Sequence, residues 1–252
     1  MAVSLAVLLS DNNARRQRKP LPDVSHVLLE RTLFEPPRAS AAMRWATQVR
    51  RLFPNAEVIP YAWHLLSHGP DDGLRGLSSR TLEGEPRKFG GLQASDEVAR
   101  AWEAVRPCYD ALGAKRIVVR TPTSITPGAI GRKRLQAFTE ARRADGFELV
   151  WEPEGLWGPT ETTALARSLG VTPMGPAFVA GRPNNEGADP EVLYHPQAWL
   201  RVDAMGRRPR LSADQLDALA DHVDVVGAAT LVFAGPKALS NLSAAADALE
   251  LG

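Results

Sequence analysis

Cysteine is almost absent from this sequence: Cys108 is the single cysteine among 252 residues. One cysteine can form neither an intramolecular disulfide nor a zinc site built from several thiolates. Cys108 lies in a helical pattern and has no evident histidine partner, so we expect a buried and unreactive thiol. The chain therefore has no disulfide framework, and its length is sufficient to bury a large hydrophobic core instead.

The sequence also lacks an excess of charge of either sign: it has 30 lysines and arginines and 29 aspartates and glutamates, for a net charge of +1. Nucleic-acid binders usually carry a clear basic excess, and the sequence has few histidines and no dense acidic cluster of the kind a metal nuclease uses. The composition thus argues against nucleic acid as a partner. One basic cluster, Arg15, Arg16, Arg18 and Lys19, is interpreted as a solvated loop rather than a phosphate-binding patch.

The apolar run near the start of the sequence covers residues 2–9 and stops at a polar Ser-Asp-Asn-Asn stretch. It is too short to span a bilayer, and no positively charged region precedes it. We therefore expect a buried first strand here, no membrane segment, and a cytoplasmic protein.

Short apolar runs alternate with helical patterns along most of the chain. Several of these runs are continuous, as expected for a parallel sheet that is covered on both faces. Eight strands with helices between them favour a barrel over an open sheet, and we predict an α/β fold: a TIM-like (β/α)8 barrel with residues 1–252 in a single domain. The predicted strands are residues 3–9, 26–29, 57–61, 116–120, 147–152, 171–174, 199–202 and 230–233.

Helical patterns fill most of the connections between these strands. The predicted helices are residues 40–53, 95–112, 128–144, 160–169, 212–223 and 236–249. Ser212 and Gln215 have the spacing of a capping box at the start of one of them. Two connections differ: residues 10–25 are too short and polar for a full first helix, and residues 62–93 form a long loop after the third strand. Long loops of this kind are often functional.

Six segments carry a resemblance to a known family, in matching order and spacing. They are ERTLFEPPRASAAMRWA, AEVIPYAWHLLSHG, LGAKRIVVRTPTSITP, FELVWEPEGLW, WLRVDAMGRRPRLSADQLDALADHV and TLVFAGPKALSNLSAAADAL. The chain resembles the YecE-like proteins, called domain of unknown function 72, over most of its length. The resemblance implies a TIM-like barrel. It implies no reaction, because the family has no established one.

Departures from the family pattern fall at the strand ends. The opening Gly-Thr-Ser-Gly-Trp-Ser-Tyr motif is replaced by LAVLLSDNN, and the Phe-Asn-Asn motif reads FAG. In the Glu-Phe-Arg-His strand, Glu152 keeps the acid but Glu154 stands in the arginine position. Arg201 is retained, Asp203 stands where histidine is expected, and His68 matches the histidine of a Thr-His pair. The chain therefore looks like a divergent member with altered or absent activity.

Barrel enzymes carry their chemistry at the C-terminal ends of the strands and on the loops that follow. The polar residues that the predicted strands place there are Asp11, Asn12, Glu30, Arg31, His64, His68, Arg120, Glu152, Glu154 and Asp203. We take Glu152, His68 and Asp203 as candidate catalytic residues. The candidate ligand-binding residues are Arg201, Arg120, Arg31, Glu154 and Trp63. The sequence assigns no metal site and names no cofactor.

Glu152 and Glu154 have the same parity, so an extended chain points both to one face. Two carboxylates at such a short distance repel each other, which raises the pKa of one of them and makes it a general acid. A bound metal would also relieve the repulsion. In the other interpretation Pro153 ends the strand and Glu154 turns into solvent.

The histidine and arginine candidates also leave alternatives open. His64 and His68 have the i,i+4 spacing of a metal-binding pair, but Gly-Pro follows at once, and a lone pocket histidine at position 68 is favoured over a ligand pair. For Arg120 and Arg201, an internal ion pair with a barrel carboxylate is favoured over an anion clamp.

Two functions follow from these candidates. The first is a hydrolase or lyase that acts on a small sugar-like or phosphorylated ligand at the mouth of the barrel. The alternative is a catalytically degenerate barrel that binds a protein partner or serves as a scaffold, which the lost family residues favour.

Overall fold

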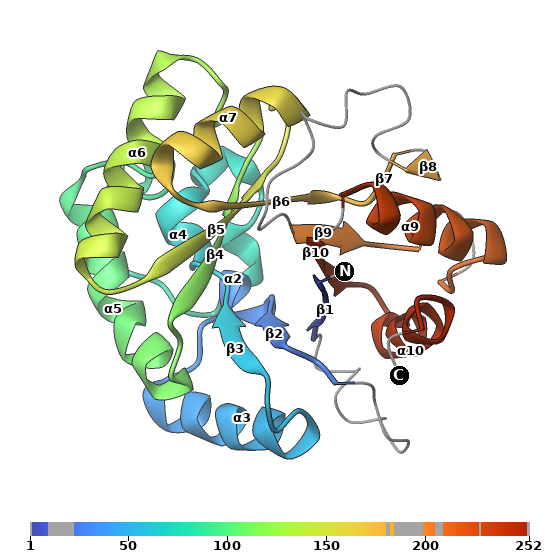
Figure 1. Ribbon diagram of the computed structural model, residues 1–252. Helices are drawn as coiled ribbons and strands as arrows, with labels where there is room; N and C mark the ends of the chain where they lie inside the picture. Colours follow the sequence, from blue (N-terminus) through green and yellow to red (C-terminus); the bar gives the residue numbers. More distant parts are fainter. Residues whose placement is uncertain are drawn as a thin grey trace.

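The computed structural model describes residues 2–9, 23–179, 182–183, 199–204, 209–226 and 228–250. Within them, an 8-stranded sheet has the order β3-β2-β1-β10-β9-β6-β5-β4, with neighbouring strands parallel (Figure 1). Its strands are β1 Ala2–Leu8, β2 His26–Leu29, β3 Glu57–Pro60, β4 Arg116–Thr121, β5 Glu148–Pro153, β6 Thr172–Pro176, β9 Trp199–Val202 and β10 Ala228–Phe233. A short antiparallel pair, β7 Phe178–Val179 and β8 Arg182–Pro183, follows β6.

The two ends of this sheet, β3 and β4, approach each other and nearly close the ring. Tyr61 and Val118 form a parallel bridge, and the Ala62 amide donates a hydrogen bond of 2.7 Å to the Val118 carbonyl oxygen. Each of the eight strands therefore lies beside its neighbours in the order of the chain, as in a TIM barrel. The predicted fold class and all eight predicted strands are confirmed.

The long helices lie outside the strands (Figure 1). They are α3 Ala39–Leu52, α5 Asp96–Leu112, α6 Ala129–Ala144, α7 Pro159–Leu169, α9 Ala213–Val226 and α10 Ala238–Ala248. Each lies within a few residues of its prediction. The capping box is confirmed: the Ser212 amide donates to Gln215 Oε1 over 3.1 Å, and the Gln215 amide to Ser212 Oγ over 3.3 Å.

Some predictions fall outside the described residues. Most of the reduced first helical connection lies there, with Asp11, Asn12 and the basic cluster Arg15, Arg16, Arg18 and Lys19. No helix in the described part of the chain is long and apolar enough to cross a membrane.

The long loop after β3 is folded rather than extended. It carries α4 His64–Ser67 and three short 3-10 turns, η1 Pro70–Asp72, η2 Arg75–Leu77 and η3 Pro86–Lys88. The end of the loop returns to α4, where the amides of Gly90, Gly91 and Leu92 donate to the carbonyl oxygens of Leu65, Ser67 and Leu66. A second short helix that the sequence did not predict, α2 Arg31–Phe34, follows β2. These segments build one side of the barrel mouth.

Side-chain parity divides the apolar residues between two cores. Alternate residues of the strands, among them Ala6, Leu28, Ile59, Val118 and Val150, fill the inside of the barrel. The residues between them pack outward against the helices. Cys108 of α5 is in this outer layer, and burial raises the pKa of its thiol to about 12. The prediction of a buried thiol is confirmed, and the raised pKa agrees with low reactivity.

Gly90 and Gly73 form a matched pair for testing how closely the loop packs on α4. Both have positive φ, +73° and +75°. A Cβ on Gly90 would lie 1.9 Å from the His68 carbonyl oxygen, whereas a Cβ on Gly73 would meet no atom within 4 Å. We expect Gly73→Ala to lower the free energy of unfolding by about 1 kcal/mol through backbone strain, and Gly90→Ala by about 3 kcal/mol or more. Urea denaturation measures both, and equal losses would contradict the close packing.

Candidate functional site

Three charged side chains meet at the C-terminal end of the barrel because of strand parity and register. Arg120 and Glu152 each come two residues after an inward-facing valine, on β4 and β5, and they are register partners. Arg201 of β9 is the register partner of the inward-facing Val232 on β10. All three therefore face the barrel axis just above its apolar interior.

Glu152 is held by both arginines. Its Oε2 accepts a hydrogen bond of 2.9 Å from Arg120 Nε, and its Oε1 accepts one of 2.8 Å from Arg201 Nη1. Arg120 Nη2 also donates to Glu30 Oε1, at the end of β2, over 2.7 Å. Arg201 Nε donates to Asp203 Oδ2 over 2.7 Å. We call Glu30, Arg120, Glu152, Arg201 and Asp203 the mouth network.

The mouth network keeps Glu152 ionised. Burial raises the pKa of this carboxyl, which is 7% exposed, but Arg120 and Arg201 outweigh burial and hold the pKa below its usual value. Burial lowers the pKa of each arginine, and Glu152 more than compensates, so both stay charged. A general acid needs a proton to give near neutral pH. Glu152 therefore has the environment of a structural anion, and the favoured interpretation of the arginines as internal ion-pair partners agrees with these distances.

Glu152 and Glu154 do not form the carboxylate pair that their spacing suggests. Arg120 lies within 4 Å of both, with its Nε 2.9 Å from Glu152 Oε2 and 3.9 Å from Glu154 Oε1. The side chain of Glu154 is 47% exposed. The sequence led us to expect a raised pKa at one of the two carboxyl groups; the pKa of Glu152 is instead lowered, because the guanidinium groups of Arg120 and Arg201 beside it outweigh burial.

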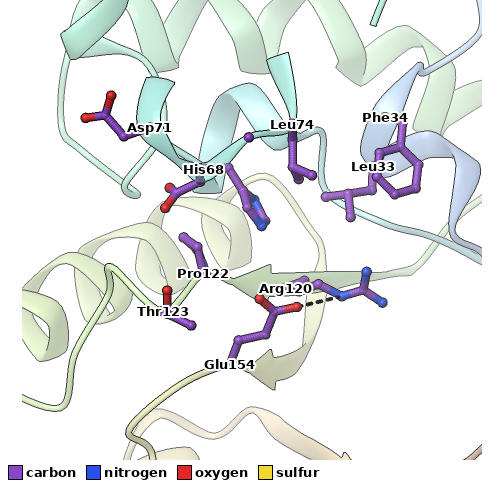
Figure 2. A pocket seen from close by; sticks show the side chains of 11 residues that line it. Leu33, Phe34, His68, Asp71, Leu74, Arg120, Pro122, Thr123 and Glu154 are labelled. Atoms are coloured by element: carbon purple, nitrogen blue, oxygen red, sulfur yellow. Dashed lines mark ion pairs between the residues drawn. The ribbon is translucent and has the colours of Figure 1, made fainter. Parts of the chain in front are cut away.

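A pocket of about 420 Å³ opens beside Arg120, between the end of β4, the loop after β5 and the loop after β3 (Figure 2). Apolar side chains, Leu33, Phe34, Leu74 and Pro122, form part of its wall. The remaining lining residues are His68, Asp71, Asp72, Gly73, Arg120, Thr123 and Glu154. Its volume is in the range of small-molecule sites, about 300–1,000 Å³.

His68 points its ring into this pocket (Figure 2). The residue is 3% exposed, its Nδ1 lies 2.8 Å from Ser67 Oγ, and Nε2 has no hydrogen-bond partner among the described residues. Burial lowers the pKa of the ring to about 4, and Arg120 adds to this although Asp72 opposes it. The imidazole is therefore neutral at pH 7, and it can accept or pass on a proton. The interpretation of a lone pocket histidine agrees with this placement.

His64 makes different contacts from His68. Its Nδ1 lies 3.0 Å from the Leu33 carbonyl oxygen, and the ring is buried beside Trp63. α4 ends at Ser67, so the two rings are not on one continuous helix face. No group of three histidine, cysteine, aspartate or glutamate side chains that could hold a metal occurs in the described ranges.

Two of the candidate ligand-binding residues lie away from the pocket. Trp63 is completely buried between strands and helices, with the Arg80 guanidinium 5.2 Å from its ring. Arg31 is exposed and lies 5.2 Å from the ring of Trp45 on α3. Neither lines the pocket.

Other pocket residues were missed from the sequence. Phe34 belongs to the unpredicted helix α2, and Asp72 lies in η1 of the long loop. Asp72 Oδ2 accepts hydrogen bonds from the Gly69 amide over 2.6 Å and from Ser124 Oγ over 3.2 Å. The unusual length of residues 62–93 was the one signal that pointed to this wall.

Comparisons with known proteins support the fold. No family model matches the chain, and no curated protein sequence matches it. A DUF72 family protein from Thermotoga maritima is 14% identical, with a TM-score of 0.52 over 90% of this chain and 83% of that one. The catalytic domain of a family GH18 chitinase from the fern Peteris ryukyuensis is 14% identical, with a TM-score of 0.57 over 99% and 100%. D-psicose 3-epimerase from Clostridium cellulolyticum, solved with D-tagatose, is 9% identical, with a TM-score of 0.52 over 99% and 98%. These identities show a common TIM-barrel fold and nothing finer.

Replacing Glu152 by glutamine tests the mouth network. The variant leaves Arg120 and Arg201 without their shared charge, so we expect it to lower the free energy of unfolding by about 3 kcal/mol or more. Glu148→Gln is the control: Glu148 is also on β5 and pairs with Arg116 over 2.8 Å, but its side chain is 72% exposed. We expect this variant to lose less than about 1 kcal/mol. Similar losses in the two variants, measured by urea denaturation, would contradict a structural role for Glu152.

Two histidines with lowered pKa values, the half-buried His26 and the buried His68, predict that acid destabilises the protein. The pKa values of His26, which lies beside Arg116 inside the barrel, and of His68 are both lowered to about 4, mainly by burial. Below about pH 6.5 these histidines bind protons in the unfolded chain but not in the folded chain. They therefore leave stability unaffected above this pH, and the free energy of unfolding declines toward pH 4. We expect a lower urea midpoint at pH 5 than at pH 7.5, with a smaller difference in His68→Gln. An unchanged wild-type midpoint would refute this.

Proposed function

We propose that the pocket beside Arg120 binds a small sugar-like molecule and that the protein acts on it as a hydrolase or lyase. In this proposal the chain is a divergent relative of the YecE-like proteins. The observation that carries the proposal is the pocket of about 420 Å³ at the C-terminal mouth of the barrel, with a buried, neutral histidine pointing into it. This end of a TIM barrel is where such enzymes have their active sites.

The composition of the pocket wall supports a sugar-like ligand. A sugar ring presents carbon-bound hydrogens on its faces and hydroxyl groups around its edge. Leu33 and Phe34 offer apolar surface to the ring, while His68, Asp72 and Glu154 offer hydrogen-bond acceptors to hydroxyl groups. A phosphorylated ligand has less support, because Arg120 is the one lysine or arginine among the described side chains of the lining and its guanidinium already contacts Glu30 and Glu152.

The chemistry that we propose uses acid–base groups and no oxidant. His68 is neutral at pH 7 and is the candidate general base, which takes a proton from water in hydrolysis or from a carbon–hydrogen bond in elimination. The Glu154 carboxylate, on the loop after β5, stabilises positive charge that develops on the ligand. Glu152 and Asp203, which we considered as catalytic from the sequence, are assigned to the mouth network instead.

The solved barrels give limited support by analogy. D-psicose 3-epimerase, solved with D-tagatose, and the chitinase catalytic domain are described as sugar enzymes with this fold. Because one fold supports many unrelated reactions, this likeness raises the case for a sugar-like ligand without choosing a reaction.

A specific observation favours the alternative, a catalytically degenerate barrel that binds a protein partner. At the strand ends, Glu152 is hydrogen-bonded to both Arg120 and Arg201. An active barrel usually leaves polar groups there available to substrate. In that case the mouth network is a rigid support, and the loops around it form the binding surface.

A ligand screen followed by a product assay distinguishes these two functions. We expect a panel of monosaccharides and sugar phosphates to give thermal shifts with sugars, and the stabilising compound to be converted to a product detectable by NMR. His68→Gln should lower turnover by about 100-fold or more, since a general base contributes this much, while the protein still folds. A panel with no shift, together with a protein that co-purifies stably, would reject the enzyme and support the scaffold.

A further inference from the structure

We propose that the ligand of the mouth pocket carries a positive charge, as an amino sugar does, and that Glu154 is the residue that selects for it. This inference rests on the proposed function, because it concerns the same pocket. It deepens that proposal by naming the substrate class: an amine-bearing, sugar-like compound rather than a neutral or phosphorylated one.

The charges that line the pocket are the first argument. Among the described side chains, its wall contains three carboxylates, Asp71, Asp72 and Glu154, and one guanidinium, that of Arg120. The charge of Arg120 is already matched outside the lining, since its Nε lies 2.9 Å from Glu152 and its Nη2 lies 2.7 Å from Glu30. The pocket therefore presents negative charge to whatever enters it. Like charges repel, so a phosphate is disfavoured and an ammonium group is attracted.

Glu154 is the carboxylate best placed to receive an ammonium group. Its nearest cation is Arg120 Nε at 3.9 Å, which is beyond hydrogen-bond distance. No side chain in the described part of the chain donates a hydrogen bond to it, so both carboxylate oxygens keep their acceptor capacity. Asp72 differs, because its Oδ2 already accepts from the Gly69 amide and from Ser124. An ammonium group has three donors that can use this capacity.

His68 provides an independent observation that a polar ligand enters the pocket. Its side chain is almost completely buried and points into the cavity, and its Nε2 has no partner among the described residues. This ring nitrogen is therefore available to form a hydrogen bond with a ligand hydroxyl or ammonium group. Because the ring is neutral at pH 7, it does not offset the negative charge of the wall.

An organic cation fits this wall better than a bare metal ion. The described residues contain no group of three metal-ligating side chains. The pocket is also larger than a metal site, and Leu33 and Phe34 give it apolar surface that an organic ring can cover (Figure 2).

Sugars that share one ring but differ in charge test the inference. The probes are D-glucosamine, D-galactosamine and D-mannosamine, each compared with its neutral parent sugar and the 6-phosphate of that sugar, by calorimetric titration at pH 7 and low salt. We expect at least one amino sugar to bind about tenfold or more tightly than its parent, and the phosphates to bind most weakly. Raising the salt concentration should reduce the preference for the amine.

Two matched variants identify the residue responsible. Glu154→Gln removes the charge that we assign to selection, so affinity for the amino sugar should fall much more than affinity for the neutral sugar, and the preference for the amino sugar should drop below about threefold. Glu161→Gln is the control, because its side chain is 48% exposed, close to the 47% of Glu154, and it pairs with Arg132 on the other side of the loop after β5. This variant should keep the full preference.

The outcomes separate this inference from the proposed function. If neutral sugars bind as tightly as amino sugars, or if Glu154→Gln keeps the preference, the amine inference is overturned and the sugar site stands. If a phosphorylated sugar binds most tightly, the charge argument is overturned in the same way. If no sugar of any charge binds, both proposals fall.

Discussion

The carboxylate of Glu152, held between Arg120 and Arg201, is the interaction on which the rest of the barrel mouth depends. It joins β4, β5 and β9, and Arg120 extends the connection to Glu30 at the end of β2. Charges above an apolar interior are costly to bury, and they are stable here because each one faces an opposite charge at hydrogen-bond distance. The same pairing also fixes how close these strand ends can lie, which sets the shape of the opening.

This constraint moves the candidate chemistry away from the strand ends. Once Glu152 and both arginines have bound one another, the groups that remain available to a ligand lie on the loops, above all His68 and Glu154. The end of the loop after β3 packs closely beside His68, because it returns to α4 and places Gly90 against the His68 carbonyl oxygen. The chain thus combines an ion-paired network in the barrel with a pocket at its rim.

Much of the fold could be predicted because its signals are local. Continuous apolar runs, glycines after helices and the Ser212–Gln215 spacing depend on a few neighbouring residues, and the eight strands and six long helices agree with them. The short helices α2 and α4 were not predicted, since four residues are too few to show a helical period. They exist because hydrogen bonds to distant segments hold them, such as that from Thr32 to the Tyr61 carbonyl oxygen.

The sequence by itself determined the order of strands, the closed barrel and the end at which polar residues collect. It also named Glu152, Arg120, Arg201, His68 and Glu154 as residues of that end. Only the tertiary structure decided what each of them does. Arg120 meets Glu30 across 90 residues of chain, and Arg201 meets Glu152 across 49. Such pairings depend on distances across the closed barrel. These distances decide whether a carboxylate is held in an ion pair with a guanidinium or stays available to a ligand.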